Sequence, residues 1–460
     1  MQRWLCRACH FTALVWFILA FATNAAVAQY QVAKPDSEIA PARTWTFTDL
    51  FRFKGSDGYS STAGLVEDAA GNLYGTTLNG GVSSDRECLK AGGCGVVFEL
   101  APGPNGAWTE AVVHSFTFAK TDGCFPFAGV IVDGGGNLYG ATEGCGAFGL
   151  GAVFELSPGP DGAWTETLLY SFAGGPADGA VPLGGLLMGA DGKLYGTTGY
   201  GGTSIDSSAC DNKPLPNGCG TVFELTPRAD GRWNEKVLYN FAGGSTDGAT
   251  PPAGVTMDAT GNLYGVTKFG DSFQGTVYQL KPGKGGVWTE TVLHKFPEGL
   301  KDGTYPVGVP ALDARGNLFG VTEGGGRKEL GTIWEIAPAK QGGWTESVLY
   351  TFGEAGPSDA NAPYSGVILD ANGNLYGTTS AGGGGCQGFG CGTVYVLDGE
   401  TRKLTRLVDF DDTATNSPEG PLLMDAQGSL YGTTAFGGAT ANPNCQGVLP
   451  GCGTVFKLAP

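Results

Sequence analysis

Three ionisable residues follow copies of one short motif, G-x-L-Y/F-G-x-T. The residue directly after the threonine of this motif is Glu143, Lys268 or Glu323 in three of the copies. Carboxyl and ammonium groups exchange protons with substrates, and glycosidases use two carboxylates held about 5–10 Å apart. These residues are therefore the catalytic candidates if the chain is an enzyme, either a polysaccharide lyase or hydrolase or a lactonase-like protein.

Aromatic residues occupy the next position in three copies, at Tyr200, Phe269 and Phe436. Aromatic rings offer large apolar faces that can stack on a sugar or on a peptide. The three residues are therefore candidates for ligand binding, and packing within the loops is the structural alternative.

Asp-Gly steps form a second recurring feature. They could make an acidic ring that binds Ca²⁺ or a cationic ligand, whereas in the structural alternative each aspartate caps its own turn. One aspartate per repeat is a sparse ligand set, and the chain has no D-x-D-x-D-G loop, so we expect neither a metal nor a cofactor. The aspartates are Asp57, Asp122, Asp178, Asp247 and Asp302.

Ten of the twelve cysteines lie after residue 28, and an even number is typical of a disulfide-bonded exported protein. Eight of them form four local pairs, each just before a β-rich segment, which leaves Cys124 and Cys145. Disulfides that close such short loops stabilise a fold by about 2–3 kcal/mol each. The local pairs are Cys88 with Cys94, Cys210 with Cys219, Cys386 with Cys391, and Cys445 with Cys452.

Zinc binding is the rival interpretation of the cysteines. Structural zinc sites combine closely spaced cysteine pairs, often with histidine. Here the pairs have differing spacings and stand in separate repeats. His114 and His294 occupy the position that Tyr170, Tyr239 and Tyr350 hold in other repeats, so we expect them to be packing residues.

Other chemical signatures are missing from the sequence. It has no G-x-S-x-G elbow, no histidine that accompanies a serine or cysteine nucleophile, and no phosphate-binding loop. Its formal net charge is −17 and becomes −19 without Arg3 and Arg7. Nucleic acids and anionic membranes attract basic surfaces, so this acidic balance argues against both as partners.

The motif recurs seven times at spacings of 55 to 69 residues, and each unit contains four candidate β-strands, a to d. Strand a is short and apolar and is followed by a D-x-x-G turn, and strand b is the motif itself. In every unit strand c has a sequence similar to VVFEL at 96–100. Strand d has a sequence similar to WTEAVVHSF at 108–116. Glycine makes up 81 of the 460 residues, which suits many tight turns. The motif copies lie at 71–77, 136–142, 192–198, 261–267, 316–322, 373–379 and 428–434.

The two ends of the chain predict how the repeats close. The last unit stops after its strand c at 454–458, and residues 45–53 match the missing strand d. We therefore predict an all-β fold, a seven-bladed β-propeller over residues 44–460, in which the N-terminal strand completes the last blade. Closure of this kind removes exposed sheet edges.

Symmetry separates structural residues from functional ones. A residue that recurs in most blades serves the blade, whereas chemistry should break the sevenfold pattern. By this rule the tryptophan and glutamate of W-T-E are structural, as are the motif threonines. The glutamates are Glu110, Glu166, Glu235, Glu290 and Glu346, and the tryptophans are Trp108, Trp164, Trp233, Trp288 and Trp344.

In a four-stranded meander the d–a and b–c loops emerge on the same face. All ten cysteines should lie on that face, and the Asp-Gly steps should surround the mouth of the central channel. The longest and most varied loops are also there, so we predict that it is the binding face. The second and fifth blades of seven are nearly opposite, so Glu143 and Glu323 are not expected to form a catalytic pair.

The repeated G-N-L-Y-G-T-T and G-T-V-F-E-L segments resemble those of the GloVer tandem repeats, a family of exported bacterial proteins described as having a choice of anchor. The resemblance covers residues 44–460 and implies a secreted or surface repeat protein with no assigned activity. Relatives often carry a C-terminal anchoring tail. Here Pro460 follows strand c directly, so we do not expect a covalent anchor.

Residues 1–28 have the features of a signal peptide. Arg3 and Arg7 precede an apolar segment at 11–22, and Ala26-Val27-Ala28 is a cleavage site. Twelve apolar residues are too few to span a membrane, which needs about 20. We expect cleavage, a linker at 29–43, no later membrane span, and a secreted or periplasmic product.

Together these features favour an exported, monomeric, non-enzymatic binding module that presents disulfide-braced loops to an unidentified glycan, peptide or protein. The alternatives are a propeller enzyme and a structural repeat protein of the cell envelope.

Overall fold

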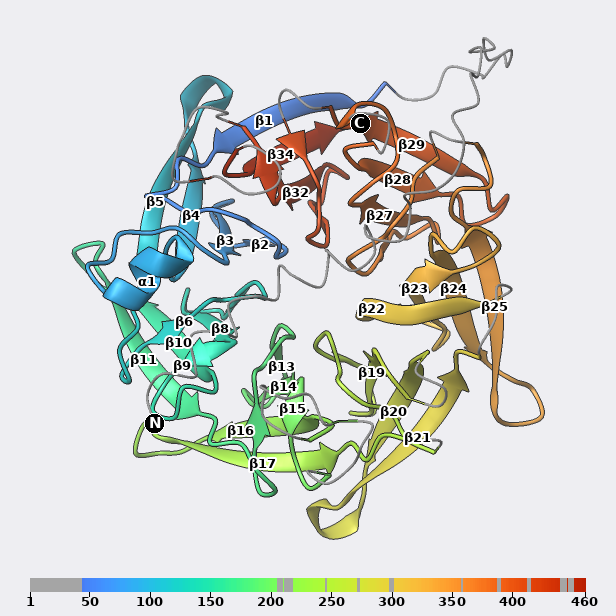
Figure 1. Ribbon diagram of the computed structural model, residues 1–460, viewed down its shortest axis with the longest axis horizontal. Helices are drawn as coiled ribbons and strands as arrows, with labels where there is room; N and C mark the ends of the chain where they lie inside the picture. The colour runs from blue at the N-terminus through green and yellow to red at the C-terminus, as the bar shows by residue number, and fades with distance from the viewer. Residues whose placement is uncertain are drawn as a thin grey trace.

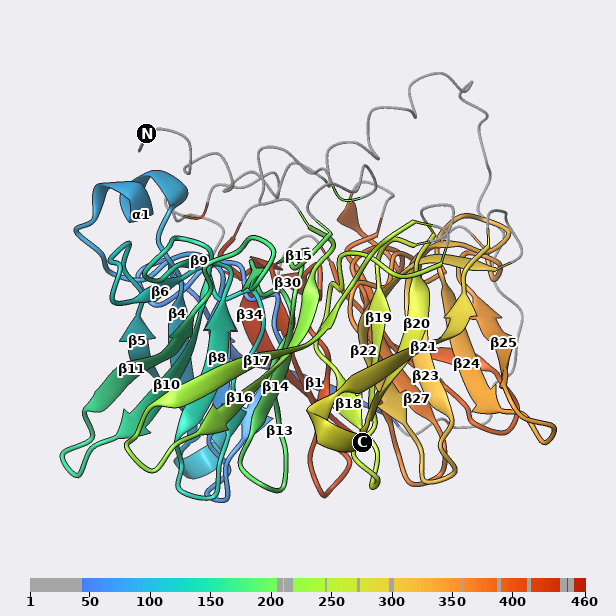
Figure 2. The same cartoon turned by 90° about the horizontal axis from the view of Figure 1, so that it is seen from below.

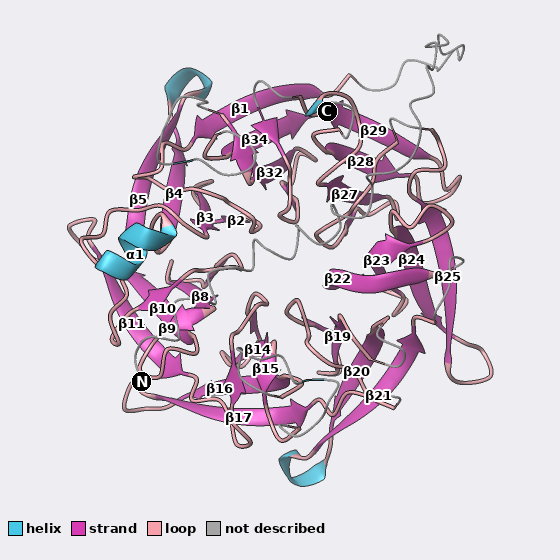
Figure 3. Cartoon of the chain, viewed as in Figure 1, coloured by secondary structure: helices cyan, strands magenta, loops and turns pink. Residues whose placement is uncertain are grey.

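The computed structural model describes residues 44–204, 210, 218–244, 246–270, 274–297, 302–356, 359–386, 390–411, 415–438, 445 and 451–460. The predicted signal peptide and linker lie outside these residues. Seven four-stranded antiparallel sheets stand in a ring around one axis (Figures 1 and 3). The chain is therefore a seven-bladed β-propeller, as its seven motif copies predict.

Each blade runs from strand a near the axis to strand d on the outside (Figure 1). The a strands are β2 (Val66–Glu67), β7 (Ile131–Val132), β13 (Leu187–Met188), β18 (Thr256–Met257), β22 (Gly303–Leu312), β26 (Ile368–Leu369) and β31 (Leu423–Met424). The b strands, which carry the motif, are β3 (Leu73–Thr77), β8 (Leu138–Thr142), β14 (Leu194–Thr198), β19 (Leu263–Thr267), β23 (Leu318–Gly325), β27 (Leu375–Thr379) and β32 (Leu430–Thr434).

The c and d strands form the outer half of each blade. The c strands are β4 (Val96–Pro102), β10 (Ala152–Pro158), β16 (Thr221–Pro227), β20 (Thr276–Pro282), β24 (Thr332–Pro338), β28 (Thr393–Leu397) and β34 (Thr454–Ala459). The d strands are β5 (Trp108–Ser115), β11 (Trp164–Ser171), β17 (Trp233–Asn240), β21 (Trp288–Lys295), β25 (Trp344–Thr351), β29 (Leu404–Asp409) and β1 (Thr46–Arg52).

The last blade confirms the predicted ring closure. Strand β1 pairs antiparallel with β34, from Thr46 opposite Ala459 to Arg52 opposite Thr454. The sheet order is β1-β34-β32-β31, so the first strand of the chain is the outer strand of the seventh blade. The two ends of the propeller are thus held together by one sheet.

The second glycine of the motif lets an aromatic ring of strand c lie directly on strand b. A Cβ at Gly75 would overlap Phe98, and one at Gly320 would overlap Trp334. The phenylalanine that follows strand d then packs against this ring in the next blade. The ring pairs and their centroid distances are Phe53–Phe98 (5.1 Å), Phe116–Phe154 (5.2 Å), Phe172–Phe223 (5.1 Å), Phe241–Tyr278 (5.0 Å), Phe296–Trp334 (6.1 Å), Phe352–Tyr395 (5.5 Å) and Phe410–Phe456 (5.3 Å).

The tyrosine of the motif joins neighbouring blades at the edge that carries the D-x-x-G turns. The Tyr74 hydroxyl donates to Asp68 of the D-x-x-G turn, and its ring packs edge-on against Trp164 of the next blade at 6.1 Å. Equivalent contacts join Tyr139 with Trp233 and Tyr195 with Trp288. The W-T-E tryptophans are therefore structural, as the symmetry rule predicts.

All ten cysteines form the five expected disulfides: Cys88–Cys94, Cys124–Cys145, Cys210–Cys219, Cys386–Cys391 and Cys445–Cys452. The face that carries the b–c and d–a loops is called the disulfide face below. Figure 2 shows on this face the helix α1 (Arg86–Ala91), which contains Cys88, and the short strands β6 (Gly123–Cys124) and β9 (Gly144–Cys145). Two similar ribbons accompany them, β12 (Gly179–Ala180) with β15 (Tyr200–Gly201) and β30 (Thr415–Asn416) with β33 (Phe436–Gly437).

The W-T-E glutamates lie between blades, each facing the Asp-Gly aspartate of the loop that enters its own blade. In Glu110, Glu235 and Glu290 the Oε1 atom is buried and accepts no hydrogen bond from the described part of the chain. Burial, and then repulsion by Asp57, Asp178 or Asp247, raises the pKa of these carboxyls from the usual 4.5 to about 7.

We therefore expect the propeller to lose stability as the pH rises from 5 to 8. Because folding raises these pKa values, the folded state binds more protons than the unfolded chain between about pH 4.5 and 7. The stabilisation is complete below this window and is lost as the pH passes 7. Because these side chains keep part of their surface in solvent, which screens the repulsion, we count only about one pKa unit at each of the three carboxyls, or about 4 kcal/mol in total. Unfolding in urea at pH 5 and at pH 8 measures this difference in unfolding free energy.

The triple substitution Glu110→Gln, Glu235→Gln, Glu290→Gln is the matched control, because glutamine keeps the shape and cannot ionise. It should reduce the pH dependence and should exceed the unsubstituted protein in stability at pH 8. An unchanged slope would assign the pH dependence to other groups.

Candidate functional site

One residue in each d–a loop adopts the left-handed conformation although it is not glycine. The φ angles of these seven residues lie between 53° and 61°. Such angles are rare outside glycine, above all for the β-branched Val181 and Thr250, and they persist only where the surroundings enforce them. The left-handed residues are Ser60, Phe125, Val181, Thr250, Tyr305, Ala362 and Ser417.

Each left-handed residue links two blades through its backbone. The N–H of Phe125 donates to the carbonyl of Cys94 in the preceding blade at 2.8 Å, and the carbonyl of Phe125 accepts from the N–H of Glu143 in its own blade at 3.1 Å. Thr250 does the same between Cys219 (2.7 Å) and Lys268 (3.0 Å). The N–H donation recurs in all seven blades, and we call this ring of hydrogen bonds the belt.

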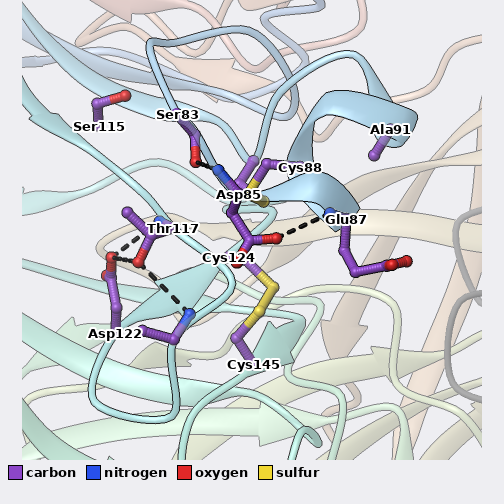
Figure 4. Close-up of a disulfide and its surroundings, with 12 residues drawn as sticks. Ser83, Asp85, Glu87, Cys88, Ala91, Ser115, Thr117, Asp122, Cys124 and Cys145 are labelled. Carbon is purple, nitrogen blue, oxygen red and sulfur yellow. Dashed lines mark hydrogen bonds between the residues drawn. A yellow bond between two sulfur atoms is a disulfide. The ribbon is translucent and has the colours of Figure 1, made fainter. Parts of the chain in front are cut away.

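Four disulfides supply carbonyls to the belt. The acceptors are Cys94, Cys219, Cys391 and Cys452, each the second cysteine of its local pair. Figure 4 shows the fifth disulfide, Cys124–Cys145, beside Cys88, with the Asp85 cap of α1 nearby. The disulfides thus fix the loops of one blade against the d–a loop of the next.

Two positions per blade lie inward of the belt, and we call them the inner rim. The first directly follows the motif threonine, and the second comes two residues after the left-handed residue. Just beyond the second position, neighbouring backbones touch: a Cβ on Gly129 would overlap the Gly64 carbonyl, and one on Gly420 would overlap the Ala63 carbonyl. These close approaches place the inner rim next to the ring axis.

The side chains of the inner rim break the sevenfold symmetry. In blades 4 to 7 four polar residues follow one another around the axis, and we call them the polar arc. Lys268 Nζ and Glu323 Oε2 form an ion pair at 2.7 Å. Tyr364 is next, within electrostatic range of both Glu323 and Glu419.

Glu419 and Glu143 are the two inner-rim carboxyls that form no ion pair with any residue the structure describes. Burial raises the pKa of each to about 7, and a 3.0 Å hydrogen bond from Ser417 Oγ opposes the shift at Glu419. Both side chains nevertheless keep part of their surface open to solvent. At neutral pH each carboxyl is therefore partly protonated. The protonated form can donate a hydrogen bond, whereas the ionised form only accepts.

The aromatic candidates do not form one surface. Tyr200 is only 4% exposed and lies close enough to Glu143 for that carboxylate to add to the rise in its pKa that burial causes. Phe269 packs edge-on against Tyr305 at 6.0 Å, and Phe436 belongs to β33 in the last blade. In the part of the chain that the structure describes, no ring contact joins any two of the three.

The Asp-Gly aspartates lie elsewhere than expected. Asp178 accepts hydrogen bonds from the Tyr170 hydroxyl (3.0 Å) and from the N–H groups of Ala173 and Gly179 (both 2.7 Å). Tyr170 belongs to strand d, the outermost strand of its blade. The placement of these residues at the mouth of the central channel is therefore wrong: they cap turns on the outer side of the blade interfaces, at Asp57, Asp122, Asp178, Asp247 and Asp302.

Glu143, Lys268 and Glu323 all lie on the inner rim, and the structure joins only Lys268 with Glu323. Sequence reasoning missed Tyr364 and Glu419 because it compared the blades at the end of strand b alone. The same symmetry rule, applied to the second residue after the left-handed position, finds both: the other blades have Thr62, Phe127, Leu183, Pro252 and Val307 there.

The inner rim can therefore donate and accept hydrogen bonds at several adjacent points. Burial, followed by the nearby carboxylates, raises the pKa of the Tyr364 hydroxyl, so this group stays protonated and can donate.

In the described residues, no helix has the length and apolar character needed to cross a membrane.

The chain matches a protein family described as the Gloeobacter/Verrucomicrobia repeat. The match covers residues 37–272, 213–389 and 268–460 in three overlapping segments. No curated protein matches the chain.

Solved structures resemble the chain in fold. The extracellular domain of a candidate one-component system from B. thetaiotaomicron is 12% identical with a TM-score of 0.50, and the match covers 91% of this chain and 42% of that one. A candidate oxidoreductase (glucose dehydrogenase) from Thermus thermophilus is 14% identical, with coverage of 90% and 99% and a TM-score of 0.41. A candidate gluconolactonase is 12% identical, with coverage of 90% and 92% and a TM-score of 0.39.

Proposed function

Because the chain belongs to the Gloeobacter/Verrucomicrobia repeat family, whose repeats here build a complete propeller, we propose that it is an exported, monomeric binding module that holds its ligand at the inner rim of the disulfide face. The observation that carries the proposal is the polar arc. Four blades with the same backbone place Lys268, Glu323, Tyr364 and Glu419 side by side, where the remaining blades have largely apolar residues.

Of a glycan, a peptide and a protein, a glycan fits these groups best. Sugar hydroxyls donate and accept hydrogen bonds, and carboxyls with a pKa near 7 can do either. The Lys268–Glu323 pair and the Tyr364 hydroxyl add fixed donors and acceptors beside them. The rigid belt supports these groups, and such support favours binding because little ordering is needed.

The five disulfides support export to the periplasm or the medium, since such bonds persist in oxidising compartments. The signal peptide proposed at residues 1–28 would direct that export.

A glycan array followed by calorimetry on the best binder tests the proposal. Glu419→Gln and Glu143→Gln should each weaken binding about 10- to 100-fold, since hydrogen bonds to charged groups contribute about 1.5–3 kcal/mol. Tyr364→Phe should weaken it about 3- to 10-fold. Glu400→Gln is the matched control, because Glu400 is exposed in the turn between strands c and d, on the opposite face.

Equal affinity of Glu419→Gln, Glu143→Gln and Glu400→Gln would refute the inner rim as the binding site. Binding only to peptides or proteins would keep the site and change the ligand class. No ligand from any class would favour a structural role in the cell envelope.

A propeller enzyme is the second candidate, and the raised pKa of Glu143 and Glu419 favours it. A carboxyl with a pKa of about 7 is suited to general acid catalysis at neutral pH. Cleavage of array glycans or lactones, followed by mass spectrometry, would reveal it. Turnover that is lost in Glu143→Gln, Glu323→Gln or Lys268→Met would establish the enzyme.

A further inference from the structure

Five of the seven blade interfaces have either a tyrosine or a histidine at the same place. Near the end of strand d, an aromatic residue reaches the aspartate of the following d–a loop. In three blades it is tyrosine, whose hydroxyl donates to the aspartate: Tyr170 to Asp178 and Tyr239 to Asp247 at 3.0 Å, and Tyr350 to Asp359 at 2.9 Å. In the first and fourth blades it is histidine.

The two histidines belong to two equivalent clusters. His114 Nε2 lies 3.1 Å from Asp122 Oδ1, and Glu166 of the next blade completes the first cluster. His294 Nε2 lies 3.3 Å from Asp302 Oδ2, and Glu346 completes the second. In each cluster one nitrogen and two carboxylate oxygens all lie within 4.8 Å of one another.

Among the residues that the structure describes, several of these atoms have no hydrogen-bond partner. Oε1 of Glu166 and Oε1 of Glu346 are buried and accept no hydrogen bond there, like the same atom of the other W-T-E glutamates. In the second cluster alone, His294 Nε2 is also buried without a partner among these residues, because it lies near Asp302 without the alignment that a hydrogen bond needs. Buried polar atoms that stay unpaired cost free energy, so a group that contacts all three side chains at once would stabilise each cluster.

We propose that the two clusters are divalent transition-metal sites, each binding Zn²⁺ through one histidine nitrogen and two carboxylate oxygens and so joining two adjacent blades. A histidine nitrogen selects Zn²⁺ and related ions over Ca²⁺ and Mg²⁺, which prefer oxygen ligands alone. Three protein ligands leave a fourth position for water.

The surroundings hold the aspartates in place for this role. Oδ2 of Asp122 accepts from the N–H and the hydroxyl of Thr117 at 2.8 and 2.7 Å (Figure 4). These bonds leave Oδ1 toward His114. Oδ1 of Asp302 accepts from the N–H of Gly303 at 2.8 Å, which leaves Oδ2 toward His294. Partners of this kind orient metal ligands and tune their affinity.

The tyrosine interfaces supply a control within the same chain. Between the second and third blades, Asp178 and Glu235 stand as Asp122 and Glu166 do, but Tyr170 offers a hydroxyl in place of a nitrogen. The fold is therefore compatible with either residue at this place. The sequence led us to expect that His114 and His294 are packing residues. That expectation did not take into account that each histidine lies close to a glutamate of the next blade, Glu166 or Glu346.

The test uses the exported protein without a histidine tag, stripped with EDTA and titrated with ZnCl₂ by calorimetry. Elemental analysis after gel filtration should find two zinc ions per chain, and the melting temperature should rise with zinc. His114→Tyr and His294→Tyr should each bind one ion, and the double variant should bind none while its far-ultraviolet circular dichroism stays unchanged. Tyr170→His should create a third site.

Absence of zinc binding by the unsubstituted protein would overturn the proposal. So would zinc binding by His114→Tyr/His294→Tyr that matches the unsubstituted protein, since those ions would sit elsewhere. Neither result depends on a glycan, so this test stands apart from that of the inner rim.

Discussion

Deletion of residues 44–53 should abolish the folded propeller. These residues include β1, the outer strand of the seventh blade. Phe53 is fully buried against Phe98 of the first blade, and Phe47 packs against Phe410 and Phe456 on the other side. Loss of the fully buried Phe53 alone costs about 3–5 kcal/mol, and loss of the half-buried Phe47 and of the whole strand pairing adds to it, which is a large part of the stability of a typical domain. Circular dichroism should show no cooperative melting transition.

A circular permutant separates strand loss from chain truncation. Its order is 54–460 followed by a short turn and then 44–53, so β1 follows β34 as strand d follows strand c in the other blades. The pairing of Thr46 with Ala459 brings the joined ends together. The permutant should fold and melt within a few degrees of the original chain. A cooperative transition in the deletion variant, or an unfolded permutant, would contradict the closure that the structure shows.

The repeated residues made the blades predictable from the sequence. Gly75, Tyr74 and their counterparts act within one blade or on its direct neighbour. The glycine contact recurs in all seven blades, and the tyrosine–tryptophan contact recurs at six of the seven blade interfaces. A pattern that recurs in a single chain identifies such residues without any alignment. Ring closure was predictable for the same reason, since residues 45–53 carry the strand d pattern at the wrong end of the chain.

The inner rim was only partly predictable, because its contacts join residues from different blades. Lys268 and Glu323 are 55 residues apart, and Tyr364 lies near Glu419 only because the blades curve around one axis. The turn aspartates were misplaced because the d–a loop crosses the whole blade, and an aspartate such as Asp178 lies at its outer end, beside Tyr170. The sequence does not give the radial position of a loop residue.

Removal of the Cys386–Cys391 disulfide should lower the unfolding free energy of the propeller and also increase the local mobility of the polar arc. The variant Cys386→Ser/Cys391→Ser should lose about 2–3 kcal/mol of unfolding free energy, since the bond closes a loop with a sequence separation of 5. Its second effect is local. The Cys391 carbonyl accepts from the N–H of Ser417 at 2.8 Å, and Ser417 Oγ donates to Glu419. Amide exchange at Ser417 should accelerate about 10-fold or more, and ligand affinity should fall.

Cys445→Ser/Cys452→Ser is the matched control for this link between a disulfide and the inner rim. Its sequence separation is 7, so the loss of stability should be similar. Its belt acceptor, the Cys452 carbonyl, accepts a hydrogen bond from the N–H of Ser60 in the first blade. The inner-rim residues of that blade, Thr62 and Leu78, are neither ionisable nor aromatic. Exchange should therefore accelerate at Ser60 and not at Ser417, while affinity stays within about 2-fold. Equal loss of affinity in both variants would mean that the disulfides act through overall stability, because a local effect must follow the hydrogen bond that each cysteine carbonyl accepts.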